Sequence, residues 1–172
     1  KVGFPVEFKT AEPHIHQNSD VGGVILNLQN SDEVFAAYED LAFRLGHLVT
    51  IEPMISAGPE LAFGMVNDPQ FGPMVMVGSG GIYIEILKDR CFSLAPFDQN
   101  EALDMIDSLK TRPLLDGVRG SVACDVQQVA KALSNFSHLA NDLSDVISEI
   151  DVNPLIISPT SCTAVDALVI KK

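Results

Sequence analysis

Apolar residues in the first third of the chain follow a helical period over residues 31–45 and an extended pattern on either side. Within residues 31–45 the apolar side chains recur three and four positions apart, which places them on one face of a helix. Ser31 is the expected N-cap, two acidic residues follow it at the positive end of the helix, and Gly46 is the expected stop. The β-prone runs around this helix are residues 2–9, 23–28 and 48–54.

The rest of the chain contains many short β-prone segments and two amphipathic runs. Glycine, proline and aspartate separate the β segments so closely that they predict an antiparallel sheet. Residues 100–109 are predicted as a helix with Ile106 and Leu109 inward, and residues 125–139 as a longer helix. The β segments are residues 60–66, 75–78, 82–87, 91–94, 146–157 and 163–169. The apolar face expected for the longer helix consists of Val126, Val129, Ala130, Leu133, Phe136 and Leu139.

This mixture of strands and helices places the chain in the α+β or α/β class. A stretch rich in proline and glycine, residues 54–59, is the best candidate for a hinge. It divides a smaller N-terminal part, residues 1–53, from a larger C-terminal part, residues 54–172. With 172 residues, of which 47% are hydrophobic, the chain is long enough to bury a substantial core.

The charge of the chain disfavours several classes of partner. There are 11 basic and 23 acidic residues, which give a formal net charge of −12 at pH 7. A surface this acidic repels nucleic-acid phosphates and anionic lipid. No apolar run approaches the roughly 20 residues that cross a bilayer, and no secretory leader pattern is present. We therefore expect a cytoplasmic protein without nucleic-acid or membrane partners, whose anion sites use backbone N–H groups, a lysine or a metal ion.

Cysteine and histidine do not form a recognisable site pattern. Cys91, Cys124 and Cys162 are odd in number and widely scattered, which argues against a disulfide framework or a zinc site. We expect them to behave as small hydrophobic residues in a reducing cytoplasm. His14 and His16 flank a glycine-containing loop, where a functional role is harder to dismiss.

Features suited to phosphate binding lie near the N-terminus. Lys9 ends an apolar strand, where its flexible ammonium suits phosphate oxygens. Gly22 and Gly23 allow close approach of the backbone to an anion. Taken one at a time, a solvated lysine and an ordinary tight turn explain these features at least as well. A denser glycine cluster, Gly78-Ser79-Gly80-Gly81, is either a second close-approach loop or a hairpin connection.

Acidic and amide side chains converge near the end of the chain. In a strand, residues two apart share a face, so Glu149, Asp151 and Asn153 are expected on one side. Asp166 lies within the next apolar run, where a charge needs a partner or a metal ion. If the two strands pair, Asn153 and Asp166 meet, and their oxygen atoms suit Mg²⁺ bound together with phosphate. The alternative is a set of acids at the edge of a solvated strand.

A series of motifs, in order along nearly the whole chain, resembles the ATP-grasp domain of NDP-forming acyl-CoA synthetases, relatives of the succinyl-CoA synthetase β subunit. The motifs are Gly3-Phe4-Pro5-Val6 with Lys9, Ser19-Asp20-Val21-Gly22-Gly23-Val24, Glu52-Pro53-Met54, Pro59-Glu60-Leu61, Asp68-Pro69-Gln70-Phe71-Gly72-Pro73, Gly80-Gly81-Ile82-Tyr83-Ile84-Glu85, Leu87-Lys88-Asp89, Arg112-Pro113-Leu114-Leu115-Asp116-Gly117 and Glu149-Ile150-Asp151-Val152-Asn153-Pro154-Leu155. One such motif is weak, but the ordered series is specific. The resemblance implies an ATP-grasp fold of two α+β subdomains, with residues 1–53 as the remainder of the first and residues 54–172 as the second.

The resemblance also assigns a role to individual residues. Contacts to the ATP phosphates are implied for Lys9, and a place in the phosphate-covering loop for Gly22 and Gly23. Adenine would meet the backbone of Glu52, Pro53 and Met54, and the ribose would lie near Glu60. The positions that hold Mg²⁺ are matched by Asn153 and Asp166, and an acidic residue near the phosphoryl-transfer centre is matched by Asp151.

The implied reaction is acyl-CoA + ADP + phosphate ⇌ carboxylic acid + CoA + ATP, through an acyl phosphate and a phosphohistidine carried by another domain or subunit. Phosphoryl transfer needs mostly positioning and charge neutralisation, which a lysine, backbone N–H groups and Mg²⁺ supply. The CoA-binding and ligase domains, and the opening helix and strand of the first subdomain, are expected outside this chain. The isolated chain is therefore expected not to turn over an acyl substrate.

The sequence departs from the family at Gln17 and Asn18, where the family usually has His-Lys before Ser-Asp-Val-Gly-Gly. In some members that histidine is thought to relay the phosphoryl group, which glutamine cannot accept. His16 is the adjacent candidate to replace it, although neighbours in an extended segment point to opposite sides. Either the relay differs here or catalysis is weakened. The alternative functions are a non-catalytic nucleotide-binding regulatory module, which this departure favours, and an ATP-grasp carboxylate–amine ligase, which the motifs fit less closely.

Overall fold

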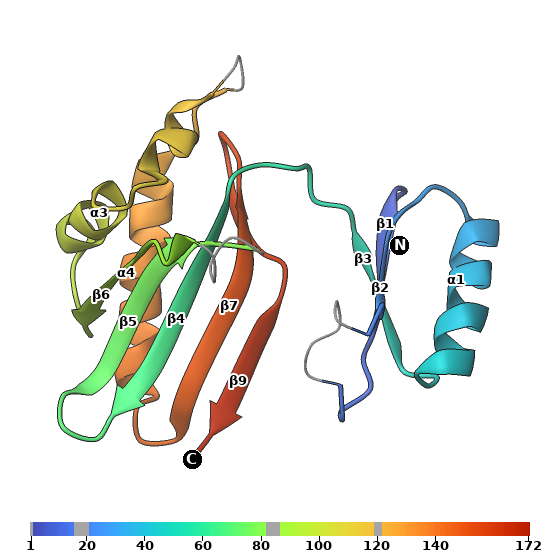
Figure 1. The fold of residues 1–172 in the computed structure, drawn as a ribbon, viewed down its shortest axis with the longest axis horizontal. Helices are drawn as coiled ribbons and strands as arrows, with labels where there is room; N and C mark the ends of the chain where they lie inside the picture. Colours follow the sequence, from blue (N-terminus) through green and yellow to red (C-terminus); the bar gives the residue numbers. More distant parts are fainter. Residues whose placement is uncertain (1, 16–20, 82–86, 119–121) are drawn as a thin grey trace. The chain divides into compact units, whose positions relative to one another are not determined.

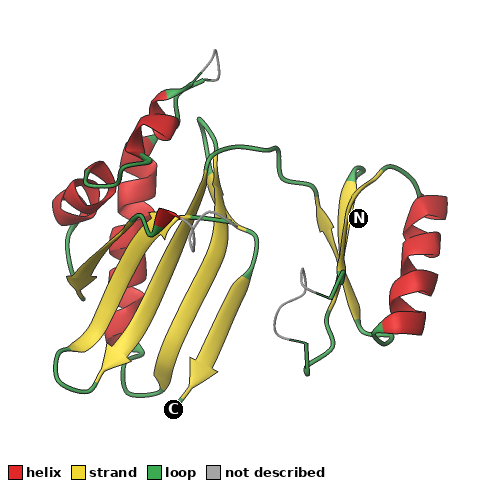
Figure 2. Ribbon diagram, viewed as in Figure 1, coloured by secondary structure: helices red, strands yellow, loops and turns green. Residues whose placement is uncertain are grey.

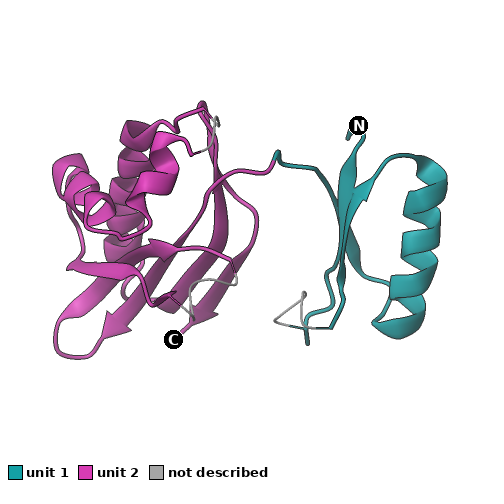
Figure 3. Ribbon diagram, turned by 45° about the horizontal axis from the view of Figure 1, so that its top comes forward, with its two compact units in different colours: residues 1–56 teal, residues 57–172 magenta. Residues whose placement is uncertain are grey.

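The computed structural model describes residues 2–15, 21–81, 87–118 and 122–172. The chain divides into two compact units, Lys1–Ser56 and Ala57–Lys172, which Figure 3 shows in teal and magenta. We refer to them as unit 1 and unit 2. The boundary lies within the stretch rich in proline and glycine, a few residues after the division that the sequence predicts.

Unit 1 is a three-stranded antiparallel sheet with one helix on one face (Figure 1). Its elements are β1 (Val6–Thr10), β2 (Val24–Leu28), α1 (Ser31–Arg44) and β3 (Val49–Pro53), and the strand order is β2-β1-β3. The helix packs Ala37 and Leu41 against Val6, Phe8 and Leu28 of the sheet. Because β1 is the central strand, each of its residues is buried.

Unit 2 is a six-stranded antiparallel sheet with its helices on one face (Figure 2). The strand order is β6-β5-β4-β7-β8, and β9 also pairs with β7. The strands are β4 (Glu60–Asp68), β5 (Gly72–Ser79), β6 (Arg90–Leu94), β7 (Ile147–Ile157), β8 (Cys162–Ala164) and β9 (Ala167–Lys171). The helices are α3 (Gln99–Asp107), the 3₁₀ helix η1 (Arg112–Asp116) and α4 (Val126–Asp142). The core between sheet and helices includes Phe63, Val77, Ile106 and Leu133.

Two details of the helices differ from the sequence prediction. Asn30, not Ser31, caps α1, because its backbone is extended and its side chain accepts the N–H of Glu33. The predicted apolar residue Leu139 of α4 is 46% exposed. The buried face of α4 instead includes Ser137, whose hydroxyl accepts the backbone N–H of Phe97 at 3.1 Å. A polar group thus occupies part of the buried face of α4, because it finds a hydrogen-bond partner there.

The predicted strand over residues 163–169 is interrupted. It forms the short strand β8 and then β9, and Asp166 lies between them. The predicted strand over residues 82–87 lies almost entirely outside the described residues. Cys91, Cys124 and Cys162 are free, and burial raises the pKa of Cys162 to about 11, so this thiol is neutral at pH 7. Among the described residues, no helix combines the length and the apolar character needed to cross a membrane.

Candidate functional site

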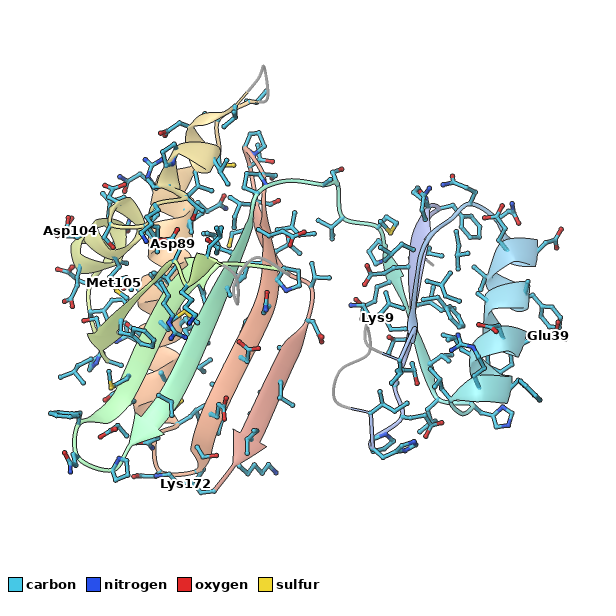
Figure 4. All side chains as sticks on the ribbon, viewed as in Figure 1. Lys9, Glu39, Asp89, Asp104, Met105 and Lys172 are labelled. Atoms are coloured by element: carbon cyan, nitrogen blue, oxygen red, sulfur yellow. The ribbon has the colours of Figure 1, made fainter. Side chains whose placement is uncertain are left out.

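Lys9 lies on the face of the unit 1 sheet away from α1, and two carboxylates hold its ammonium (Figure 4). Its Nζ lies 2.7 Å from Oε1 of Glu7 and 3.2 Å from Oε2 of Glu52. Glu7 is two residues before Lys9 on β1 and so lies on the same face of the sheet. Glu52, on β3, is the cross-strand partner of Glu7. The side chains of Lys9 and Glu7 are 9% and 6% exposed, whereas that of Glu52 is 44% exposed.

The charges around Lys9 determine its ionisation. Burial lowers the pKa of Lys9, but hydrogen bonds and attraction from Glu7 and then Glu52 raise it, and its net pKa lies above the ordinary value. Lys9 is therefore charged at neutral pH. This ammonium pairs with both carboxylates. Glu7 was not among the residues that the sequence singles out, although an acidic residue inside an apolar run was the available signal.

The predicted phosphate loop is anchored where it joins β2. Gly22 has a φ of +62°, a conformation that glycine adopts at little cost. Its carbonyl accepts a hydrogen bond from Nη2 of Arg44 at 3.1 Å, and the carbonyl of Gly23 accepts the N–H of Thr10 at 2.8 Å. Arg44 is itself held by Asp40, one turn earlier on α1. The helix and β1 therefore fix this end of the loop.

Two other predictions for unit 1 have different outcomes. Residues 16–20 lie outside the described residues, so the structure does not place the candidate His16 or the departure at Gln17 and Asn18. The segment predicted to meet adenine ends β3, and the N–H of Met54 donates to the carbonyl of Pro5 at 3.1 Å. The contact of Glu52, Pro53 and Met54 with adenine stays a prediction.

In unit 2, three segments meet where β7 becomes irregular. Oδ1 of Asn153 accepts the backbone N–H of Gly81 at 2.9 Å, and the backbone N–H of Asn153 donates to the carbonyl of Asp166 at 3.2 Å. The register of β7 on β4 shifts between Val152 and Leu155, which leaves one extra residue in β7, a β-bulge. The structure thus brings Asn153 and Asp166 together. The bulge also removes Asn153 from the regular alternation that the sequence predicts.

An uncompensated negative charge lies beside this bulge. Burial raises the pKa of Asp151, and the nearby charges of Glu149 and Asp166 raise it further. Asp166 is exposed, not enclosed in an apolar strand as the sequence predicts, because β8 ends before it and β9 begins after it. None of the salt bridges found among the described residues reaches these three carboxylates. A cation would relieve their mutual repulsion.

The oxygen atoms at the bulge fit a metal ion that arrives with its own ligands. No group of three or more histidine, cysteine, aspartate or glutamate residues in the described parts of the chain is arranged to hold a metal. Mg²⁺ is commonly bound by one or two carboxylates, with phosphate oxygens and water completing its octahedron. The amide oxygen of Asn153 and the carboxylate of Asp166 match that smaller donor set, with Asp151 close by.

The glycine cluster ends β5 and begins the connection to β6, its antiparallel neighbour, which is the hairpin alternative that its sequence allows. Gly81 has a φ of +63°, and a Cβ there would lie 2.1 Å from Oε2 of Glu60. The N–H of Gly80 donates to the backbone carbonyl of Glu60 at 2.9 Å, and a Cβ on Gly80 would lie 2.5 Å from the carbonyl oxygen of Leu61. Glu60 therefore lies against the loop that supports Asn153. Its place near a ribose stays a prediction.

The base of this loop is closed by Asp89, to which the sequence analysis assigned no role. Asp89 is 5% exposed, and its carboxylate accepts the N–H groups of Lys110 and Thr111 at 2.8 Å each and the hydroxyl of Thr111 at 2.6 Å. Its carbonyl accepts the N–H of Ser79 at 3.1 Å. Burial raises the pKa of Asp89, but these hydrogen bonds outweigh it, and the net pKa lies below the ordinary value. Asp89 thus joins the end of β5 to the segment before η1.

The chain is similar to known proteins over nearly its whole length. A family model described as an ATP-grasp domain matches residues 1–170. The chain is 41% identical over 165 residues to the ADP-forming 4-hydroxybutyrate–CoA ligase of Nitrosopumilus maritimus, covering 91% of this chain and 24% of that protein. It is 38% identical over 178 residues to the β subunit of the ADP-forming acetate–CoA ligase I of Pyrococcus furiosus, covering 99% of this chain and 76% of that subunit.

Solved structures of acetyl-coenzyme A synthetases are also similar to this chain. A dinucleotide forming acetyl-coenzyme A synthetase 1 of Ca. Korarchaeum cryptofilum, in complex with coenzyme A, Ca-AMPCP and HgCl+, is 35% identical, with a TM-score of 0.90 over 99% of this chain and 78% of that chain. A second structure of that protein, with coenzyme A and Mg-AMPPCP, is 36% identical, with a TM-score of 0.87 over 99% of this chain and 78% of that one. The chain therefore spans 24% of the N. maritimus ligase, but 76% of the separate β subunit.

Proposed function

The chain belongs to the ATP-grasp domain family, in the branch of the ADP-forming CoA ligases, and from that premise we propose that it binds Mg·ATP for an acyl-CoA synthetase. The proposed reaction converts a carboxylic acid, CoA and ATP into acyl-CoA, ADP and phosphate through an acyl phosphate and a phosphohistidine. CoA-binding and ligase domains, in the same protein or in a partner subunit, would carry out the other steps. The related structure with Mg-AMPPCP, described as having its phosphohistidine segment pointing towards the nucleotide binding site, supports this division.

The observation that carries the proposal is the arrangement at the β7 bulge. Gly81 holds the amide oxygen of Asn153, and backbone pairing holds Asp166 beside it. Burial raises the pKa of Asp151, and the charges of Glu149 and Asp166 raise it further. This arrangement supports a cation site at the bulge. Asn153 and Asp166 would hold Mg²⁺, which when bound neutralises phosphate charge during transfer.

The remaining residues have supporting roles in the proposal. Lys9 would bind phosphate oxygens as a fixed positive charge, and Gly22 and Gly23 would direct backbone N–H groups at the same phosphates. Asp151 would stay ionised once a cation lies beside it, because an opposite charge lowers a carboxyl pKa. It would then lie near the phosphoryl group that moves.

Titration calorimetry with Mg·ATP tests the proposal on the chain and on Asp166→Ala. We expect saturable binding by the chain and at least about a tenfold weaker affinity for the variant, because a metal ligand is lost. Asp104→Ala removes an exposed carboxylate of α3 (Figure 4) and should leave the affinity unchanged. Absence of binding by the chain, or equal affinities for the chain and Asp166→Ala, would contradict the proposed site.

A further inference from the structure

We propose that Glu7 competes with the nucleotide phosphates for Lys9 and so lowers the affinity of this chain for ATP. The inference rests on the proposed role of Lys9 in nucleotide binding. Its starting point is the 2.7 Å ion pair between Nζ of Lys9 and Oε1 of Glu7, two side chains that are 9% and 6% exposed. Phosphate oxygens would have to share or replace this partner.

The carboxylate of Glu7 depends on Lys9. Its Oε1 is fully buried and, apart from the close pair with the ammonium of Lys9, has no hydrogen-bond partner among the described residues. The ammonium of Lys9 is therefore its compensating charge. A buried carboxylate whose cation moves away is costly, because neither water nor another donor replaces the lost partner. This cost opposes any movement of the Lys9 ammonium away from Glu7 and towards a phosphate.

Glu7 is a stronger competitor than Glu52, whose carboxylate also pairs with Lys9. The Glu52 side chain is 44% exposed and its Oε2 lies farther from Nζ, at 3.2 Å. Water and salt screen an exposed carboxylate, whereas they screen Glu7 much less. The negative charge that an approaching phosphate meets is thus mainly that of Glu7. Repulsion grows with the charge of the ligand, so free ATP should be opposed more strongly than Mg·ATP.

Glu7→Gln isolates the charge, because glutamine has nearly the same shape and its Oε1 still accepts a hydrogen bond from Lys9. Calorimetric titrations of the full chain with Mg·ATP, and with ATP in the presence of a chelator, should show tighter binding by this variant. We expect a gain of about three- to tenfold for Mg·ATP and a larger gain for free ATP. Glu39→Gln, which removes the charge of an exposed carboxylate on α1 (Figure 4), should show no gain.

A Lys9→Met background completes the experiment. There, Mg·ATP should bind more weakly than to the chain, because a fixed positive charge that would contact the phosphates is lost. Glu52→Gln changes an exposed side chain and should disturb folding least. It should give a small gain in affinity for Mg·ATP. The inference is overturned if Glu7→Gln binds Mg·ATP as well as or less tightly than the chain while Lys9→Met still weakens binding. Absence of binding in every protein overturns the proposed function as well.

Discussion

The backbone N–H of Gly81 donates a hydrogen bond to Oδ1 of Asn153 at 2.9 Å, across 72 residues of sequence. An amide oxygen has two lone pairs, so this bond leaves one free for another partner. It also fixes which end of the amide is the oxygen. This backbone donor would hold Asn153 in the orientation that its proposed role as a metal ligand requires.

Gly81→Ala should therefore weaken Mg·ATP binding. The residue has a φ of +63° and lies against Oε2 of Glu60, so alanine would strain the loop and displace the Glu60 side chain. Gly72→Ala is the matched control, because its φ is +83° and nothing lies within 4 Å of a Cβ there. Both variants should lose about 1–2 kcal/mol of stability in thermal melts. Only Gly81→Ala should lose nucleotide affinity in calorimetry, and equal affinities for the two variants would contradict the proposed support of Asn153.

The pKa of Asp151 predicts a gain of stability on removing its charge. Because the folded-state pKa lies above the unfolded one, the protonated carboxyl stabilises the fold fully below about pH 4, and this contribution is lost as pH rises through the folded pKa. Asp151→Asn should thus be more stable than the chain at pH 7, by a few tenths to about 1 kcal/mol. The difference should vanish near pH 4. Urea unfolding at both pH values measures it, and a variant less stable at pH 7 would show that Asp151 has a cationic partner.

The ionised carboxylate of Asp89 stabilises the fold, in contrast to that of Asp151. Its pKa is lowered in the fold, so its contribution is present above the unfolded pKa of about 4 and is lost as pH falls through the folded pKa. Asp89→Asn should cost about 1.5–3 kcal/mol at pH 7, because charge-assisted bonds from Lys110 and Thr111 are weakened. Asp104→Asn, on the exposed side of α3, should change stability by less than about 0.5 kcal/mol. Similar unfolding midpoints for the two variants in urea would argue against the Asp89 anchor.

The core of unit 1 can be tested on α1. Leu41 is 0% exposed and packs into the small core with Phe8, whereas Phe43, two residues later, is 91% exposed. Leu41→Ala should destabilise unit 1 by about 2–5 kcal/mol, and Phe43→Ala by less than about 0.5 kcal/mol. Hydrogen exchange of the α1 amides should be faster in the first variant alone. Comparable exchange in both would mean that α1 does not pack on this face.

Periodicity located most elements, because one face of each was apolar enough to specify its type. It misplaced the α1 cap, since Asn30 and Ser31 are equally good capping residues and only the extended backbone of Asn30 decides between them. It also assigned Leu139 to the wrong face of α4. The buried face of α4 contains serine hydroxyls that hydrogen-bond to the backbone of Phe97. A search for apolar positions alone does not find such polar residues.

The candidate site was predictable to the extent that strand pairing determines it. Asn153 and Asp166 flank the turn between paired strands, so their meeting follows from the expected pairing. The bulge at Asn153 and the support from Gly81 were not predictable, because both depend on contacts between segments far apart in sequence. The partners of Glu7 and Asp89 were hidden for the same reason. A carboxylate shows in the sequence, but the group that compensates it does not.

Paramagnetic NMR with Mn²⁺·ATP in place of Mg²⁺·ATP locates the metal directly. Mn²⁺ has the same preference for oxygen ligands and broadens the signals of nearby nuclei. If Asn153 and Asp166 hold the metal, the amide signals of Gly81, Asn153 and Asp166 should broaden most on titration, while those of Gly72 and Phe43 persist. Saturable nucleotide binding with sharp signals at Gly81, Asn153 and Asp166 would contradict the metal site at the β7 bulge.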